Sequence, residues 1–500
     1  MMSVFSHLPI LQVILPLLAA PCVALCMAVE RWRGLAWWLT MLISALSFAI
    51  SLLLYQQVST GGTLIYALGD WPAPIGIVYV IDQASALVLP VISGIAFVVT
   101  LAARHLVERE IAARDQPLFY TAWLLTLAGM LGQITTGDAF NIFVFLEIAS
   151  LSGYALVAMG AGTDRRALPA AFNYLILGTV GATFYVIGLG LLYMLTGTLN
   201  IIDLSNRIAD VESTRALYTA LAFMALGLFL KMALFPLHFW LVPAYGYAPS
   251  AVAALMAATA TKVSVYVLMR VFFGIFGVEF SSIIDSFGLL IMTLGIFAAF
   301  VGTLAAIVET DLKKLFAQSS IAQLGYIAIG FGLMNKAGLV ASFIHVVNHA
   351  MMKGAIFLAL GIIAVQTGLV SIRHIAGAGR QIPMTMAAIL AGGLALIGVP
   401  LTAGFISKLY LIRALIASEL WLIALLTFIS SALALAYIWK IVEAAWLQPR
   451  PAGAPQLNET IGQWLPAWIL VGVTIALGVY ATPLVEAASA AAATLLGGAQ

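Results

Sequence analysis

Long apolar runs alternate with short polar segments along all 500 residues of the chain. A helix of about 20 apolar residues crosses the hydrocarbon core of a bilayer, and cutting the chain at its polar and Gly/Pro-rich breaks predicts about fourteen such spans. Because hydrocarbon offers backbone groups no hydrogen-bond partners, each span is predicted to be helical. The predicted spans are 9–29, 35–55, 80–103, 117–136, 139–161, 168–196, 216–245, 249–277, 283–308, 315–334, 339–364, 384–412, 418–439 and 464–488.

Composition indicates the same class of protein. Hydrophobic residues make up 63% of the chain and charged residues only 8%, which excludes an ordinary soluble domain and predicts an all-α polytopic membrane protein. The net charge of +2 gives no basic surface for nucleic acid. Cys22 and Cys26 lie one helical turn apart in an apolar span, where we expect them to pack as small apolar side chains.

Basic residues predict how the spans are threaded. Thirteen lysines and arginines lie in the odd-numbered connections and four in the even-numbered ones. An excess of basic residues marks the cytoplasmic side, so both termini are predicted on the outer face. Arg31 and Arg33 follow the first apolar run instead of preceding it, which is typical of a retained helix rather than a cleaved signal peptide.

Several charged residues lie deep within predicted spans. A charge at mid-membrane costs between about 3 and 10 or more kcal/mol unless it is paired or hydrated. One such residue could reach the surface with a long side chain, but a series along the chain indicates a path for ions. The residues are Glu147, Lys231, Lys262, Lys353 and Lys408.

Two of these lysines lie close to prolines. Lys231 precedes Pro236 in one span, and Pro400 precedes Lys408 in another. Proline removes a backbone hydrogen bond and frees a carbonyl, so both helices are predicted to break near mid-membrane. Broken helices at corresponding places of two halves indicate inverted repeats with an ion site between them. The predicted division is 1–116 for the first three spans, 117–277 and 278–446 for two five-span repeats, and 447–500 for the last span.

Glu147 is the only carboxylate near the middle of a predicted span. A nearby ammonium favours the charged form of a desolvated carboxylate, so the proton affinity of a Glu147–Lys231 pair would depend on the distance between the partners. That behaviour suits a proton carrier, and an ion pair that merely orients two helices is the alternative. Asp82 and Asp138 stand at the starts of spans and are expected to stay near water, and Arg270 is expected to reach the outer surface with its long side chain.

His345, His349 and Lys353 follow one another at four-residue intervals and therefore share one helix face. Histidine is the side chain best suited to passing protons near neutral pH. We expect these residues and Lys262 to belong to the proton pathway, with His238 at its border. Histidines bonded within helix packing are one alternative and a zinc site is another, but no third ligand is placed to complete it, so no metal is predicted.

Five ordered stretches resemble the antiporter-like subunits shared by respiratory complex I, membrane-bound hydrogenases and Mrp-type multisubunit Na⁺/H⁺ antiporters. The segments LGDWPAPIGIVYVIDQASALVL and TGDAFNIFVFLE are most similar to the D-type component of the Mrp antiporters. The five stretches, within residues 130–415, are TGDAFNIFVFLEIASLSGYAL, KMALFPLHFWLVPAYGYAPSAVAALMAATATKVSVYVLMR, ETDLKKLFAQSSIAQLGYI, HVVNHAMMKGAIFLALG and GVPLTAGFISKLYL.

The resemblance implies about fourteen helices in two inverted five-helix repeats and no bound cofactor. It implies that Glu147 and Lys231 form a coupled pair, that Lys262 and the histidine span form a hydrated central axis, and that Lys408 is the terminal lysine of the second half. Asn173 departs from the pattern, since relatives commonly have lysine there.

The predicted function is therefore a proton-translocating subunit of a multisubunit Na⁺/H⁺ antiporter in the bacterial cytoplasmic (inner) membrane. Its expected partners are a homologous A-type subunit, small membrane subunits, membrane lipid, protons and Na⁺. A proton-pumping subunit of NADH:quinone oxidoreductase or of a membrane-bound hydrogenase is the alternative. A membrane module for inorganic-carbon uptake beside a soluble zinc protein is a third candidate.

Overall fold

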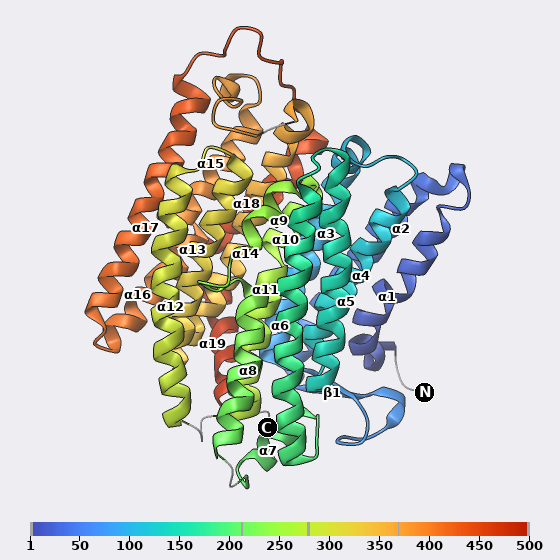
Figure 1. The fold of residues 1–500 in the computed structure, drawn as a ribbon, viewed down its shortest axis with the longest axis vertical. Helices are drawn as coiled ribbons and strands as arrows, with labels where there is room; N and C mark the ends of the chain where they lie inside the picture. The colour runs from blue at the N-terminus through green and yellow to red at the C-terminus, as the bar shows by residue number, and fades with distance from the viewer. Residues whose placement is uncertain (1–3, 212–213, 278–280, 369, 498–500) are drawn as a thin grey trace.

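The computed structural model describes residues 4–211, 214–277, 281–368 and 370–497, in which long helices run roughly side by side as one bundle (Figure 1). Among these residues, twelve helical segments are long and apolar enough to cross a membrane. The helices are α1 Leu8–Leu25, α2 Arg33–Gly61, α3 Gln83–Glu110, α4 Gln116–Thr135, α5 Ala139–Ala158, α6 Ala167–Thr196, α7 Ile201–Ile208, α8 Thr214–Met232, α9 Leu241–Tyr247, α10 Ser250–Ala258, α11 Ala260–Met269, α12 Ser281–Val308, α13 Leu312–Gly332, α14 Lys336–Thr367, α15 Pro383–Ile397, α16 Ala403–Ala417, α17 Trp421–Val442, α18 Ile461–Val479 and α19 Thr482–Leu496.

The all-α prediction is confirmed, with one small addition. The strands β1 (Leu64–Ala67) and β2 (Val78–Ile81) pair antiparallel, with Leu64 opposite Ile81. The predicted span 80–103 therefore starts too early, because its first residues complete this hairpin and the helix begins at Gln83. The total of fourteen spans stays a prediction, since α13 and the pair α15–α16 are not among the twelve segments.

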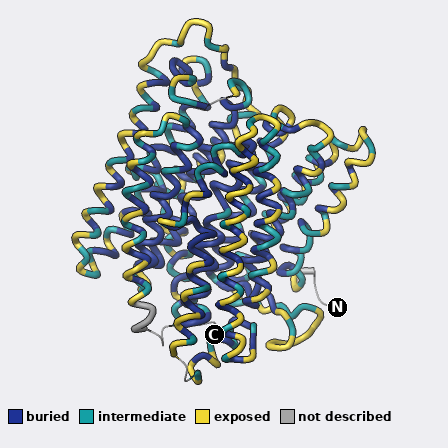
Figure 2. The backbone as a smooth tube through the Cα atoms, viewed as in Figure 1, coloured by how far each residue is buried: buried dark blue, intermediate teal, exposed yellow. Residues whose placement is uncertain are grey.

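The outer surface of the bundle is apolar, unlike that of a soluble protein. Figure 2 shows buried backbone through the centre of the bundle and exposed backbone along its outer helices. The outer residues are largely apolar, for example Leu422, Phe428 and Leu435 of α17. In contrast, Lys262 and Lys353 are among the largest fully buried side chains. An apolar exterior around charged interior groups suits a protein in lipid, where ionisable residues face the bundle interior.

The two predicted helix breaks are confirmed. The helix α8 ends at Met232 and α9 begins only at Leu241, with Pro236 between them. The helix α15 ends at Ile397 and α16 begins at Ala403, with Pro400 between them. Carbonyls freed at the first break are used locally, since the indole Nε1 of Trp240 donates to the Leu230 oxygen at 2.8 Å.

Two further spans, for which no break was predicted at a particular residue, are also broken. The span 249–277 divides at Thr259 into α10 and α11, and it continues into a π-helical turn, η5 (Arg270–Phe276). The Thr259 hydroxyl donates to the Leu255 oxygen, a side-chain bond that competes with regular helix. The span 464–488 divides between Val479 and Thr482, where Pro483 cannot continue the preceding helix. Hydropathy gave no sign of the break at Thr259, whereas Pro483 is a sequence signal for the second break.

A backbone motif recurs at the start of the second helix of each predicted repeat. Asp138 caps α5 by accepting from the Asn141 amide at 2.7 Å, and Asp311 caps α13 by accepting from the Lys314 amide at 3.2 Å. Each aspartate also forms an isolated antiparallel bridge with the segment that follows the next helix, Asn200 in the first half and Ser371 in the second. The division into two five-helix repeats stays a prediction.

Candidate functional site

The predicted pair of Glu147 and Lys231 is brought together. Glu147 lies on α5, and Lys231 lies in the last turn of α8, directly before the break. The Lys231 Nζ is 3.5 Å from Oε1 of Glu147, 2.7 Å from the hydroxyl of Ser150 and 3.4 Å from that of Tyr154. The Lys231 side chain is 6% exposed and that of Glu147 is 23% exposed. The ammonium is therefore enclosed, while the carboxylate is partly exposed. At 3.5 Å, the ion pair between them can become shorter or separate with a small movement.

A small cavity connects this pair to the break in the next span. It measures about 40 Å³, and its lining includes Gln133, Ser150, Lys231, Thr259 and Ser264. A polar cavity of this volume can hold at least one water molecule, which can bridge groups too far apart for a direct hydrogen bond. Lys231 and the junction of α10 with α11 thus share one polar space.

Lys262 lies on α11 next to this junction and is fully buried. Its Nζ donates to the carbonyl oxygen of Ala257 and to the hydroxyl of Thr261 at 3.4 Å. Ala257 lies at the end of α10, where the break leaves carbonyls without helical partners. In the part of the chain that the structure describes, Lys262 has no carboxylate partner and is held by neutral oxygens.

His345 and His349 lie on α14 with their rings stacked, 6.1 Å between centroids. The Nδ1 atom of His345 shares a hydrogen bond of 2.8 Å with the Ser407 hydroxyl of α16. Within the described residues, Nε2 of His345 and both ring nitrogens of His349 are buried without a protein partner. Lys262 acts electrostatically on both rings, and Lys408 acts on His345. The histidines therefore lie close enough to lysines for their charges to interact, and their unpartnered nitrogens can bind water or a proton.

Lys353 also lies on α14, but its ammonium points to α13. It donates to the Phe316 oxygen at 2.6 Å and to the Ser319 hydroxyl at 2.5 Å. Ser319 stands seven residues before Tyr326, as Glu147 stands seven residues before Tyr154. The spacing to a tyrosine is the same in both helices, but the group before it is a serine on α13 and a glutamate on α5.

Lys408 lies on α16 just after the second break. It donates to the Leu396 and Ile397 oxygens at 2.5 and 3.1 Å and to the Ser431 hydroxyl at 2.6 Å, which uses its three protons. The two carbonyls end α15, where the helix dipole presents partial negative charge. A helix terminus therefore supplies the counter-charge that a carboxylate supplies to Lys231.

His238, predicted to border the pathway, lies inside the first break. Its ring stacks against those of Phe235 and Phe239, with centroids 5.4 and 4.7 Å away. Its Nδ1 is buried without a partner among the described residues. The position suits a border of the pathway, and no contact to Lys231 is present among its described interactions.

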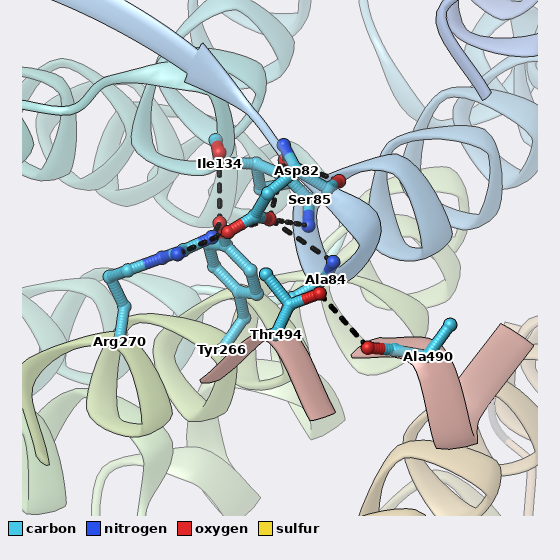
Figure 3. A network of polar contacts seen from close by, with 8 residues as sticks. All are labelled: Asp82, Ala84, Ser85, Ile134, Tyr266, Arg270, Ala490 and Thr494. Atoms are coloured by element: carbon cyan, nitrogen blue, oxygen red, sulfur yellow. Dashed lines mark hydrogen bonds and ion pairs between the residues drawn. The ribbon is translucent and has the colours of Figure 1, made fainter. Parts of the chain in front are cut away.

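The expectations for Asp82 and Arg270 were wrong. Both side chains are buried rather than exposed at the surface, since Asp82 is 0% and Arg270 9% exposed. Instead, the guanidinium Nη1 and Nη2 atoms of Arg270 donate to Oδ2 and Oδ1 of Asp82 at 2.6 and 2.8 Å (Figure 3). The sequence held a signal for this pair, since both residues are at the predicted outer ends of their spans and therefore at similar depth.

A cavity of about 140 Å³ opens at the predicted cytoplasmic end of α10. Glu110 accepts from the Ser250 amide and hydroxyl at 2.7 and 2.6 Å, and Lys313 donates to the same hydroxyl at 3.1 Å. At its rim, Arg166 donates to Asp164 at 2.7 Å, and this hydrogen bond holds the pKa of the Asp164 carboxyl below its usual value. Charged side chains of both signs thus surround an opening near the start of α10.

Asn173, which departs from the common lysine, lies on an exposed face of α6. In the described residues, no group of three or more histidine, cysteine, aspartate or glutamate side chains is placed to hold a metal ion.

Comparison with known proteins agrees with this arrangement. The model of the family described as NADH:quinone oxidoreductase/Mrp antiporter, transmembrane, matches residues 136–434. The chain belongs to this family. The resemblance seen in the sequence motifs is therefore confirmed, and the chain is a multi-span membrane protein.

Relatives of the family include both redox and antiporter components. The chain is 38% identical over 494 residues to the N component of the NADH-quinone oxidoreductase of Desulforudis audaxviator, covering 94% of each. It is 30% identical over 440 residues to the D component of the Na(+)/H(+) antiporter of Alkalihalophilus pseudofirmus, covering 87% of each.

Two solved structures share the fold over nearly the whole chain. One is the Mrp complex of a Dietzia species, with a TM-score of 0.89 and 25% identity over 99% of this chain and 98% of the other. The second is the membrane-bound sulfane sulfur reductase, an archaeal respiratory membrane complex, with a TM-score of 0.90 and 28% identity over 98% of each chain. The fold thus occurs in an antiporter complex and in a respiratory complex.

Proposed function

We propose that the chain is the proton-carrying, D-type component of a multisubunit Na⁺/H⁺ antiporter, a part of a transporter rather than an enzyme. The observation that carries the proposal is the Glu147–Lys231 pair at the end of a broken helix, next to a polar cavity that leads to the α10–α11 junction. Relatives named as D components of Na(+)/H(+) antiporters and the shared fold with an Mrp complex support the antiporter assignment.

The pair works by changing its own separation. A proton on Glu147 removes the charge that attracts Lys231, so the ammonium is freed to give its proton to the cavity. The proton then passes by water and side chains through Lys262, His349 and His345 toward Lys408. Protons that move inward along the membrane potential gain about 2.3 kcal/mol per charge for each 100 mV, and this energy drives Na⁺ outward.

The expected partner subunits are those of multisubunit antiporters to which relatives of this family belong. An A-type homologous subunit and small membrane subunits are the expected partners, in a bacterial cytoplasmic membrane with both termini outside. The sodium site is not assigned to residues of this chain.

A second function is favoured by one observation. The 38% identity to the N component of an NADH-quinone oxidoreductase fits a proton-pumping subunit whose energy comes from electron transfer elsewhere. The same residues would carry protons in that complex.

The test is antiport by vesicles that carry the chain with the products of its neighbouring genes. Glu147→Ala and Lys231→Ala are each expected to abolish ΔpH-driven Na⁺/H⁺ exchange and Na⁺-dependent growth. Glu108→Ala is the matched control, since it removes an exposed carboxylate paired with Arg104 at 3.1 Å. Full antiport by assembled Glu147→Ala and Lys231→Ala complexes would refute the proposal. Redox-driven pumping without antiport in wild type would establish the second function.

A further inference from the structure

The buried Asp82–Arg270 pair lies between the buried Lys262 and a cavity of the molecule. On one side, Lys262, Tyr266 and Arg270 follow one another at four-residue intervals, so all three share one face of α11 and η5. On the other side, Arg270 lines a cavity of about 220 Å³ with Thr136, Ser205, Asn206 and Thr494. The pair therefore stands between the central lysine and a cavity at the predicted outer face.

Tyr266 extends the contact into the bundle. Its hydroxyl accepts from Nη2 of Arg270 at 2.6 Å and donates to the Ile134 oxygen of α4 at 3.1 Å. Figure 3 shows Asp82, Arg270 and Tyr266 directed toward one another, with Thr494 of α19 beside them. Three segments that are distant in the sequence, the start of α3, the end of α11 and α4, thus meet in one polar contact.

The contact is held firmly in this arrangement. Besides Arg270, the Asp82 carboxylate accepts from the amides of Ala84 and Ser85 at 3.1 and 3.0 Å and from the Ser85 hydroxyl at 3.1 Å. A buried charge that loses its partner is strongly unfavourable, so the paired state dominates. A firm contact between the outer cavity and the buried Lys262 is what a closed pathway requires.

The helix at this point is irregular. Arg270–Phe276 forms a π-helical turn, in which the Gly277 amide donates to the Phe272 oxygen at 3.2 Å. Such turns are frequent at functional sites. Gly274 leaves space for the arginine, because a Cβ there would come within 3.1 Å of Cδ of Arg270.

We propose that the network of Asp82, Arg270 and Tyr266 is the outer closure of the proton pathway. When the network parts, water connects the cavity with Lys262, and a proton passes between the lysine nitrogen and the outer medium. The inference rests on the proposed function in one respect, that protons are what passes the closure. Whether water reaches the interior through this network can be measured without any transport assay.

The test measures access with a membrane-impermeant, positively charged methanethiosulfonate applied to the outer face of vesicles that contain the full complex. Cys22 and Cys26 are replaced by alanine, and single reporters are placed in the outer cavity (Asn206→Cys) and behind the closure, where the Thr261 hydroxyl lies 3.4 Å from the Lys262 Nζ (Thr261→Cys). The cavity reporter should react in every background. The inner reporter should react about tenfold faster in Asp82→Asn or Tyr266→Phe, which corresponds to about 1.4 kcal/mol.

Asn still caps α3, so Asp82→Asn removes the charge and keeps the start of the helix. Tyr266→Phe keeps the ion pair and removes only the hydroxyl, which provides a second variant if the first fails to assemble. Asp203→Asn is the matched control, because it breaks a surface pair with Arg207 at the same face. A second measurement is passive proton leak per assembled complex, which should rise in the closure variants, whereas a purely structural clamp would lower the amount of complex without raising its leak.

An unreactive cavity reporter would show that the cavity is not open to the outer side and would overturn the inference. So would an inner reporter whose reaction rate and leak are unchanged in both assembled variants. Neither result bears on Glu147 and Lys231, so failure of the closure and failure of the proposed function are distinguishable.

Discussion

Each of the two broken spans holds a buried lysine, but the partners that stabilise its ammonium group differ. At the first break, the Lys231 ammonium faces a carboxylate, Glu147, and two hydroxyls. At the second, the Lys408 ammonium faces two carbonyls at the end of α15 and the hydroxyl of Ser431. A full negative charge holds the first lysine and a helix terminus holds the second. The first lysine can therefore be controlled by protonation of its partner, whereas the second responds only to its surroundings.

A second lysine of the second half, Lys353, also lacks a carboxylate partner among the described residues. Glu147 and Ser319 occupy equivalent positions relative to Tyr154 and Tyr326. Ser319 accepts from Lys353, so the second half keeps a lysine contact without a titrating carboxylate.

The largest effect should come from removal of either lysine. Lys231→Met and Lys408→Met are each expected to reduce antiport by at least about 10²-fold, the usual contribution of a positioned proton-transfer group. The measurement is ΔpH-driven exchange in vesicles, normalised to assembled complex. Lys336→Met, at an exposed position, is the control. If one of the two variants keeps most of its activity, the two lysines do not belong to one proton pathway.

A carboxylate placed beside Lys408 should make the second break behave like the first. Ser431→Asp puts a negative charge where a hydroxyl now accepts at 2.6 Å. The lysine should bind its proton more tightly by about 1.4 kcal/mol, with a fall in exchange rate of about tenfold. Ser431→Asn matches the size of the side chain without the charge and should retain most of the rate. Equal rates in both variants would contradict the importance of the neutral partners.

The backbone at the two breaks gives an effect on stability. Gly398 has a φ of +89°, and a Cβ there would lie 3.0 Å from Cδ of Lys408. Gly398→Ala should lower the free energy of unfolding by about 1–3 kcal/mol. Ala233 has a φ of +58° at the first break, so Ala233→Gly should change stability by less than about 1 kcal/mol. Thermal unfolding of the purified complex measures both, and similar losses in the two variants would show that strain does not distinguish the breaks.

The smallest effect should come from an ion pair outside the membrane. Asp164→Asn removes the surface partner of Arg166 and should change stability by less than about 1 kcal/mol, without effect on exchange. Since the hydrogen bond from Arg166 lowers the pKa of Asp164, its contribution is complete above the unfolded pKa of about 4 and is lost as pH falls through the folded value. Unfolding of both proteins at pH 7 and at pH 3 measures the difference. A large loss at pH 7 would show that surface pairs matter as much as the buried ones.

The sequence predicted the fold and most of the site because both depend on local properties. Hydropathy reports the transfer of each segment into lipid, and proline reports a lost backbone bond, so the spans and the breaks at Pro236 and Pro400 could be predicted. The break at Thr259 could not be predicted in this way, because no proline lies there and mean hydropathy stays high across the span. The break before Thr482 does carry a proline signal in Pro483, which the predicted span 464–488 ignored.

The sequence by itself determined which ionisable side chains lie within membrane-spanning segments. The free-energy cost of placing each of them in the membrane depends on that residue and its segment alone. Only the tertiary structure decided which of these side chains contact each other. Glu147 meets Lys231, Asp82 meets Arg270, and Lys408 meets the end of α15 only after helices settle at particular depths and rotations. Those positions follow from close packing, as between Gly181 and Gly227, where a Cβ added to either residue would collide with the backbone oxygen of the other. Such packing is a property of pairs of helices that no single segment contains.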